Sequence, residues 1–205
     1  MLKHEFPDYD LLGEESSKAI RSEGPIWIID PLDGTTNYAR DYPLFAVSIA
    51  LEKNAEVVAG VVYNPLLDEL FVAEKGGGAT LNGEPIHVTQ TQELGKALLA
   101  SGFPYDVWSN PANNCEEWTR FIRRTMSVRC DGSAALDLCH VAAGRLDGYW
   151  ELDVQAWDMA AGALMVKEAG GKISLTSGAP FNLYQRNILA SNGHLHEAML
   201  EVLHL

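Results

Sequence analysis

The sequence W-I-I-D-P-L-D-G-T-T-N at residues 27–37 carries an apolar run directly into two carboxylates that are three residues apart. Asp30 is expected at the end of a strand, and Pro31 stiffens the turn that brings Asp33 back toward the same point. Both carboxylates can then reach one hard cation. Gly34 lets the backbone approach an anion, and the amides of residues 34–36 can point at phosphate oxygens. The segment therefore predicts a divalent metal and a phosphate bound in one place.

An isolated D-x-x-D segment is usually an Asx turn, in which the carboxylates only cap backbone amides. Two further motifs accompany it here, G-E-E-S at residues 13–16 and E-L-D-V-Q-A-W-D-M-A-A-G at residues 151–162. With these three motifs in order, the chain resembles the inositol monophosphatase family, whose signatures are D-P-[IL]-D-G-T-T-N and W-D-x-A-A-G. The resemblance extends from about Asp8 to the C-terminus and favours a functional role for the carboxylates.

Composition limits the size of the protein and its partners. The 205 residues, 47% of them hydrophobic, suffice for one well-buried core, so one domain is expected. The formal net charge of −13 repels polyanions and argues against nucleic acid as a partner. A phosphorylated substrate requires bound cations that reverse this charge locally, as Mg²⁺ held by a cluster of carboxylates would.

The three cysteines indicate a reducing compartment. Cys115, Cys130 and Cys139 follow no C-x-x-C spacing, and their odd number argues against a disulfide framework. The N-terminus has no apolar segment of a signal peptide, and no apolar run is long enough to cross a membrane. A soluble, cytoplasmic protein is expected.

The first half of the chain predicts hairpins. Residues 26–29, 45–51, 57–63 and 70–73 are β-rich runs separated by turns at residues 53–54 and 64–65, and further turns are expected at 76–78 and 82–83. Spacings this short predict antiparallel pairing.

The second half predicts helices between strands. Helices are expected at residues 116–126, 133–143, 157–169 and 194–203, and strands at 148–152 and 188–191. The fold class is therefore α/β. The family resemblance sharpens this to a layered αβαβα sandwich with a mostly antiparallel first sheet, and Trp27 and Trp157 are expected to pack the core behind the acidic motifs.

The chemistry that suits these residues is hydrolysis of a phosphate monoester. Metal ions can activate the attacking water, stabilise the leaving oxygen and neutralise the phosphoryl group. Carboxylates and carbonyls suit Mg²⁺, and no His or Cys cluster in the sequence favours zinc or a redox metal. The resemblance implies as metal ligands the side chains of Glu14, Asp30, Asp33 and Asp158 and the carbonyl of Leu32. The alternative roles are a helix-dipole charge for Asp158 and a solvated surface charge for Glu14.

The resemblance also implies the residues that face water and substrate. Thr35 and Glu14 would orient the nucleophilic water, whereas the alternative role of the Thr35 hydroxyl is a helix N-cap. The substrate-contacting set comprises Asp33, Gly34, Thr35, Gly132, Ser133, Ala134, Glu151 and Asp158. Glu151 would accept hydrogen bonds from substrate hydroxyls, and Asp131 would either contact the substrate or favour a turn.

The resemblance implies a Mg²⁺-dependent, Li⁺-sensitive phosphoric monoester hydrolase that acts on inositol monophosphate or a similar small polyol phosphate. A 3′,5′-bisphosphate nucleotidase or a histidinol phosphatase of the same superfamily is an alternative, although the T-T-N at residues 35–37 favours the inositol type. A non-catalytic interaction protein on this fold is another, and the intact motifs argue against it. A homodimer is expected because the family is commonly dimeric.

The N-terminus departs from the family pattern. Members normally begin with a pair of helices before the G-E-E segment, whereas this chain starts at what resembles the tail of the second helix. The resemblance thus implies one N-terminally shortened domain over residues 1–205, either a fragment or a short relative. Lower stability or self-association, and a less completely closed metal site, are expected to follow.

Overall fold

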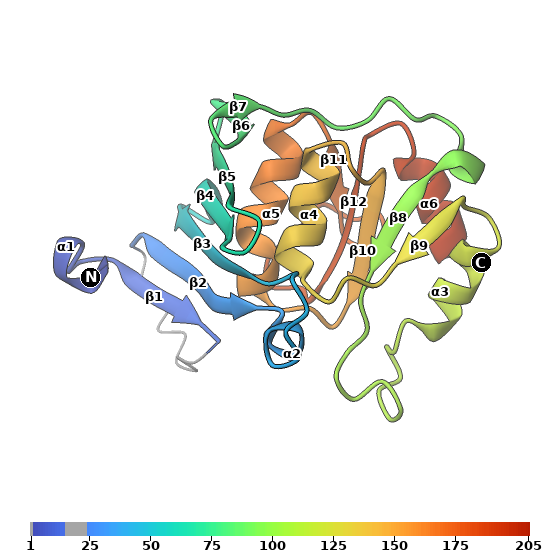
Figure 1. The fold of residues 1–205 in the computed structure, drawn as a ribbon, viewed down its shortest axis with the longest axis horizontal. Helices are drawn as coiled ribbons and strands as arrows, with labels where there is room; N and C mark the ends of the chain where they lie inside the picture. The colour runs from blue at the N-terminus through green and yellow to red at the C-terminus, as the bar shows by residue number, and fades with distance from the viewer. Residues whose placement is uncertain (1, 15–23) are drawn as a thin grey trace.

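The first sheet begins the fold and lies at one side of the molecule (Figure 1). The computed structural model describes residues 2–14 and 24–205. Seven strands pair in sequence order, and β1 is parallel to β2 whereas every other neighbour is antiparallel, as expected for this sheet. They are β1 (Asp10–Gly13), β2 (Ile26–Asp33), β3 (Ala46–Lys53), β4 (Glu56–Asn64), β5 (Glu69–Glu74), β6 (Gly78–Leu81) and β7 (Glu84–Pro85).

Tight turns set the register of these hairpins. Asn54 and Ala55, between β3 and β4, have φ angles of 52° and 60°, and Asn82 and Gly83, between β6 and β7, have 51° and 85°. Positive φ at both central residues is the requirement of a type I′ turn, whose twist matches that of the flanking strands. The predicted hairpins are thereby confirmed.

The second sheet is built from shorter strands. Its order is β11 (Lys172–Ser174), β12 (Asn187–Ser191), β10 (Gly148–Leu152), β8 (Leu98–Ser101) and β9 (Ser127–Arg129). The strand at 148–152 and the strand near 188–191 were predicted. The other three, of three or four residues each, were not, because such short segments carry no periodicity of their own and pair only with distant parts of the chain.

Helices α4 (Ala134–Ala142) and α5 (Ala156–Glu168) lie between the sheets, and α3 (Cys115–Ile122) and α6 (His196–Leu203) pack on the far side of the second sheet (Figure 1). This layering confirms the expected α/β class. Of the outermost helical layer, the described residues contain α1 (Leu2–Glu5), a single turn beside β1. No helix within the described ranges is long and apolar enough to cross a membrane.

Small residues on α5 allow the layers to approach closely. A Cβ added at Gly60 of β4 would lie 3.0 Å from the Ala161 Cα, and one at Gly162 would lie 2.5 Å from the Leu138 Cβ of α4. The A-A-G part of the downstream motif is therefore a packing requirement, because larger side chains would push α5 away from the first sheet and from α4.

One predicted helix is shorter in the structure. The helix expected at 116–126 ends at Ile122, where the amides of Arg124 and Thr125 both donate to the Phe121 carbonyl. The amide of Met126 then donates to the Ala97 carbonyl, which draws the chain into β9 beside β8. Pairing with the sheet thus ends the helix earlier than its sequence pattern predicts.

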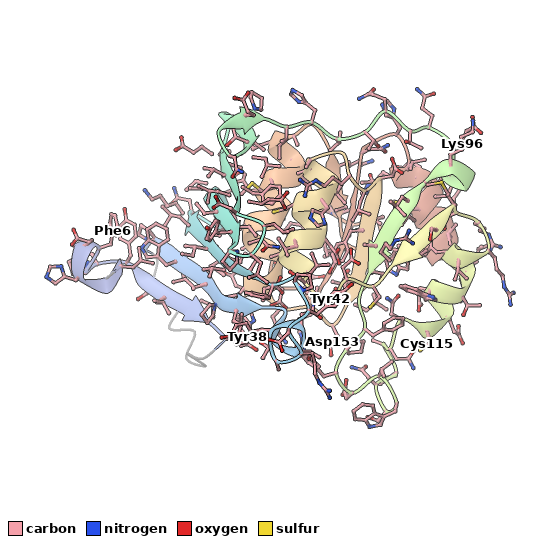
Figure 2. All side chains as sticks on the ribbon, in the orientation of Figure 1. Phe6, Tyr38, Tyr42, Lys96, Cys115 and Asp153 are labelled. Atoms are coloured by element: carbon pink, nitrogen blue, oxygen red, sulfur yellow. The ribbon has the colours of Figure 1, made fainter. Side chains whose placement is uncertain are left out.

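Trp27 does not pack behind the acidic motif as expected. Its neighbours Ile26 and Ile28 face the core, and because successive strand side chains alternate, Trp27 points to the opposite face of the sheet. There its ring contacts those of Phe6 (centroids 5.5 Å apart) and Tyr9 (6.1 Å). Phe6 lies at the α1 end of the molecule (Figure 2). Trp157, by contrast, does pack against the main core.

Candidate functional site

A bulge at the end of β2 places Asp30 and Asp33 on the same face of the sheet. Residues three apart on a regular strand point to opposite faces. Here Asp30 pairs with Ser48 and Asp33 with Ala46, so β2 contains one residue more than β3 between these pairs. Both carboxylates consequently point inward, with 2% and 7% of their surface exposed.

Helix α5 supplies the third carboxylate. Asp158 is the third residue of α5, and its Oδ2 accepts a hydrogen bond of 2.8 Å from the amide of Gln155 in a capping box. One oxygen each from Asp30, Asp33 and Asp158 lies within 4.8 Å of the others. The helix-terminal role considered for Asp158 is thus real, and it orients the carboxylate toward the other two.

Hydrogen bonds fix one oxygen of each of the other two carboxylates. Asp30 Oδ1 accepts from the Leu32 amide at 2.9 Å. Asp33 Oδ2 accepts from the Ser133 hydroxyl and, at 3.1 Å, from the Ala135 amide. Because each aspartate has a second oxygen, these bonds orient the group and leave ligand capacity for a cation.

Burial and mutual repulsion disfavour three negative charges in this volume. Burial, with Asp30 and Glu151 nearby, raises the pKa of Asp33 to about 7 despite its bonds to Ser133 and Ala135. Burial, with Asp33 and Asp30 nearby, raises the pKa of Asp158 to about 8. Burial also raises the pKa of Asp30. A divalent cation would remove this penalty, and an all-oxygen donor set suits a hard cation, so these residues fit a metal.

The turn after β2 forms α2 (Thr35–Tyr38), whose N-cap is Gly34 with a φ of 87°. A Cβ on Gly34 would lie 2.9 Å from the Leu44 carbonyl oxygen, so only glycine fits. The alternative role of Thr35 as N-cap is therefore wrong. Instead its hydroxyl donates to the Leu32 carbonyl at 3.0 Å, and the first-turn amides of α2 have no intrahelical acceptor.

Glu14 reaches the same end of the sheet from another strand. β1 runs parallel to β2 with Gly13 opposite Ile29, so Glu14, which directly follows β1, and Asp30 of β2 lie at the same end of the sheet. The side chain of Glu14 is exposed. Desolvation raises the pKa of Tyr105, and the negative charges of Glu14, Asp158 and Asp33 raise it further, so this phenol lies within the electrostatic influence of the site. Sequence reasoning did not identify Tyr105, since an exposed loop tyrosine carries no motif.

The expected substrate segment Gly132–Ser133–Ala134 lies beside α2 because of Asn37. The Asn37 Nδ2 donates to the carbonyls of Asp131 and Leu44, both at 2.7 Å. Ser133 caps α4 by accepting from the Leu136 amide at 3.4 Å while it donates to Asp33. Asn37 is the last residue of the T-T-N signature. That motif was the only feature of the sequence that pointed to Asn37, whose hydrogen bonds hold the two loops together.

Glu151 lies at the end of β10 against a glycine. A Cβ on Gly102 would lie 2.5 Å from Glu151 Oε2, so Gly102 makes room for the carboxylate. The Tyr149 hydroxyl donates to Glu151, and burial raises the pKa of this glutamate to about 7. The structure thus fixes Glu151 near the carboxylate cluster, close enough to raise the pKa values of Asp33 and Asp158.

Comparison with known proteins identifies the family of the chain. A family model described as the inositol monophosphatase family matches residues 1–204. An inositol-1-monophosphatase of Synechocystis sp. is 47% identical over 204 residues, which are 99% of this chain and 71% of that protein. An inositol-1-monophosphatase of Rhizobium meliloti is 43% identical over 198 residues, 96% of this chain and 74% of that protein.

Solved structures agree with the sequence comparisons. The inositol monophosphatase of Anabaena (Nostoc) sp. superposes with a TM-score of 0.96 at 46% identity, over 99% of this chain and 81% of that one. Sequence, family model and fold therefore agree, and the chain belongs to the inositol monophosphatase family, whose members are metal-dependent phosphoric monoester hydrolases.

Proposed function

We propose that this protein hydrolyses inositol monophosphate to inositol and phosphate, with Mg²⁺ as the bound metal. The observation that carries the proposal is the convergence of Asp30, Asp33 and Asp158 within 4.8 Å. The names of the relatives in Synechocystis and Rhizobium support the substrate class. Oxygen-only ligands favour Mg²⁺ over zinc, which prefers nitrogen and sulfur.

The metal would be held by the three aspartates, with the Leu32 carbonyl and Glu14 completing the set. Mg²⁺ bound there supplies positive charge that activates water and offsets the charge of the phosphoryl oxygens. The Leu32 carbonyl already accepts one hydrogen bond from Thr35, and its second lone pair remains for a cation.

The attacking water would be oriented by Thr35 and Glu14. Because the Thr35 hydroxyl donates its proton to the Leu32 carbonyl, its oxygen can only accept, and the natural donor is a water molecule. Glu14 would accept the second proton of that water as the general base. Thr35 and Glu14 thus determine which lone pair of the water faces phosphorus.

The substrate would lie at the end of β2, between α2 and Glu151 of β10. Its phosphate would accept hydrogen bonds from the first-turn amides of α2, next to Gly34. Its hydroxyls would donate to Glu151, and Gly132, Ser133 and Ala134 would contact the same substrate. Tyr149 and Gly102 hold the Glu151 carboxylate in place, so a hydroxylated substrate meets a preset acceptor.

Phosphate release from a panel of substrates tests this proposal. Inositol monophosphate, histidinol phosphate, adenosine 3′,5′-bisphosphate and p-nitrophenyl phosphate would be compared with Mg²⁺ and with excess chelator. We expect the highest kcat/KM for inositol monophosphate and none in chelator. A higher value for histidinol phosphate or adenosine 3′,5′-bisphosphate would reassign the substrate, and no release from any of the four compounds would favour the non-catalytic role.

A further inference from the structure

A second group of potential ligands lies outside the site described above. Asp131 is in the loop between β9 and α4, and Asp137 and His140 are on α4. One carboxylate oxygen from each aspartate and one ring nitrogen of His140 lie within 4.8 Å of one another. This group shares no residue with the three aspartates at β2 and α5.

The backbone fixes this arrangement. Asp137 and His140 are three residues apart on one helix, so their side chains lie on the same face of α4. Asp131 is held opposite them because its carbonyl accepts from the Asn37 amide at 2.7 Å and because Ser133 caps the helix two residues later. The grouping therefore follows from secondary structure and a loop anchored at both ends.

One atom of this group is incompletely satisfied. Asp137 is only 2% exposed, and its buried Oδ1 has no hydrogen-bond partner among the described residues. A buried carboxylate oxygen without a partner costs several kcal/mol unless a ligand compensates it. Burial, with Asp131, Glu151 and Asp33 nearby, also raises the pKa of Asp137 well above its usual range. The unpartnered Oδ1, beside the carboxylate of Asp131 and the imidazole of His140, is the feature that a bound cation would compensate.

His140 is available as a neutral ligand. Its ring is partly buried against Phe71, at a centroid distance of 6.4 Å. Burial lowers the pKa of His140, and the nearby Arg145 lowers it further, so the imidazole is uncharged at neutral pH. Arg145 itself donates to both carboxylate oxygens of Glu69, at 3.0 and 2.5 Å. The Arg145 guanidinium therefore pairs with Glu69.

We propose that Asp131, Asp137 and His140 bind one divalent first-row transition metal, of which Mn²⁺, Co²⁺ and Zn²⁺ are examples. One imidazole and two carboxylates form a mixed nitrogen–oxygen set, which suits these ions better than Mg²⁺. Ligand atoms around such an ion lie about 3 to 3.5 Å apart, given metal–ligand distances of about 2.0–2.2 Å. Modest side-chain rotations would bring the three atoms together from their present spacing.

The metal would connect the substrate loop to α4. Asp131 directly precedes the Gly132–Ser133–Ala134 segment, and Ser133 donates to Asp33 of the first cluster. A cation shared by Asp131, Asp137 and His140 would therefore limit movement of this segment relative to the helix. The metal would have a structural role. This proposal does not depend on which phosphate ester the protein hydrolyses.

Pulsed electron paramagnetic resonance with Mn²⁺ tests the site directly. Electron spin echo envelope modulation detects the nitrogen of an imidazole bound to Mn²⁺, whereas the Asp30–Asp33–Asp158 cluster offers only oxygen. We expect a nitrogen coupling in the wild-type protein and in Asp158→Asn, which disables the first cluster. The coupling should disappear in His140→Gln and persist in His194→Gln, which removes an exposed imidazole.

Equilibrium dialysis of Mn²⁺ measures the same site by affinity. His140→Gln should weaken one class of binding by about tenfold or more and leave the other class unchanged. Circular dichroism verifies that this variant folds. Asp131→Asn, a change in a loop, provides a second variant and should reduce the nitrogen signal at the same free Mn²⁺ concentration.

Two results would overturn the proposal. One is the absence of any nitrogen coupling in wild-type protein at saturating Mn²⁺, and the other is a coupling that survives in His140→Gln. In either case these three residues do not hold the ion. The infrared carbonyl band of a protonated acid, lost in Asp137→Asn, would then show that a proton on Asp137 compensates its burial.

Discussion

The two acidic clusters of the molecule differ in how their carboxylates are held. At the end of β2, Asp30, Asp33 and Asp158 each accept a hydrogen bond from a backbone amide. On α4, Asp137 is as deeply buried as Asp30, yet its Oδ1 has no partner among the described residues. Burial alone thus does not define a site.

The difference matters for what each cluster can do. A carboxylate with one oxygen already fixed presents the other in a set direction, which reduces the cost of organising a metal site. In the cluster of β2 and α5, each of the three aspartates has one oxygen fixed in this way, and all the ligands are oxygen atoms. The cluster around Asp137 contains an imidazole, and the Asp137 Oδ1 is held by no hydrogen bond among the described residues, which suits a structural ion more than a phosphate-binding one.

Removal of one charge from the first cluster should have the largest effect. Asp158→Asn keeps the acceptor for the Gln155 amide but lowers Mg²⁺ binding, so we expect phosphate release to fall by about 10³-fold or more, equivalent to about 4 kcal/mol. In chelator, the same variant should melt at a higher temperature than wild type, because a neutral amide replaces a buried carboxyl whose pKa is raised to about 8.

Steady-state kinetics and thermal melts measure both effects. Glu201→Gln removes one carboxylate from an exposed position on α6 and provides the matched control. Full activity of Asp158→Asn would show that the cluster is not the catalytic metal site.

Removal of the hydroxyl that would orient the water should have the next largest effect on kcat. Thr35→Val removes the hydroxyl that bridges the Leu32 carbonyl and the proposed water, and kcat should fall by about 10²-fold. Thr35→Ser retains the hydroxyl and should recover most of that loss. Mg²⁺ affinity, measured by titration calorimetry, should change little in either variant. Equal kcat values for the valine and serine variants would remove Thr35 from the mechanism.

Removal of one hydrogen bond to the Asp33 carboxylate should have a smaller effect on Mg²⁺ binding than removal of a ligand. Ser133→Ala removes a donor to Asp33 and the cap of α4. We expect Mg²⁺ affinity to fall about tenfold, as for other residues that support metal ligands, and unfolding free energy to fall by about 1 kcal/mol. Ser133→Thr should retain both. An unchanged Mg²⁺ affinity would mean that the Asp33 orientation does not depend on Ser133.

The sequence predicts the motif-bearing elements well because their signals are local. The apolar run before Asp30, the small residues of α5 and the turns at Asn54 and Asn82 each express a requirement of their own segment. The approach of the three aspartates was likewise predicted, through the family resemblance. The metal-binding and catalytic roles assigned to Glu14, Thr35 and Glu151 remain predictions.

What the sequence did not predict depends on distant partners. β8 becomes a strand because it pairs with β9 and β10, far along the chain, and its four residues have no pattern that reveals this. Trp27 faces away from the core because strand alternation, and not its hydrophobicity, sets its direction. The grouping of Asp131, Asp137 and His140 likewise appears only when the loop before α4 is placed beside that helix.

The pH dependence of stability without metal tests the first cluster without any substitution. The folded-state pKa values of Asp33, about 7, and Asp158, about 8, lie above the ordinary aspartate value of 3.8. Between these limits the folded protein binds more protons than the unfolded chain. The free energy of unfolding must therefore fall as pH rises from about 4 to about 8, by at most about 1.4 kcal/mol per pH unit for each carboxyl.

Saturating Mg²⁺ should flatten this slope, because a cation stabilises the ionised carboxylates that repel one another without it. Chemical denaturation at pH 5, 6, 7 and 8, in chelator and in Mg²⁺, gives the two slopes to compare. Asp158→Asn should flatten the chelator slope in the same way. A stability in chelator that rises over this range would contradict the raised pKa values and, with them, the view that these three carboxylates are organised for a cation.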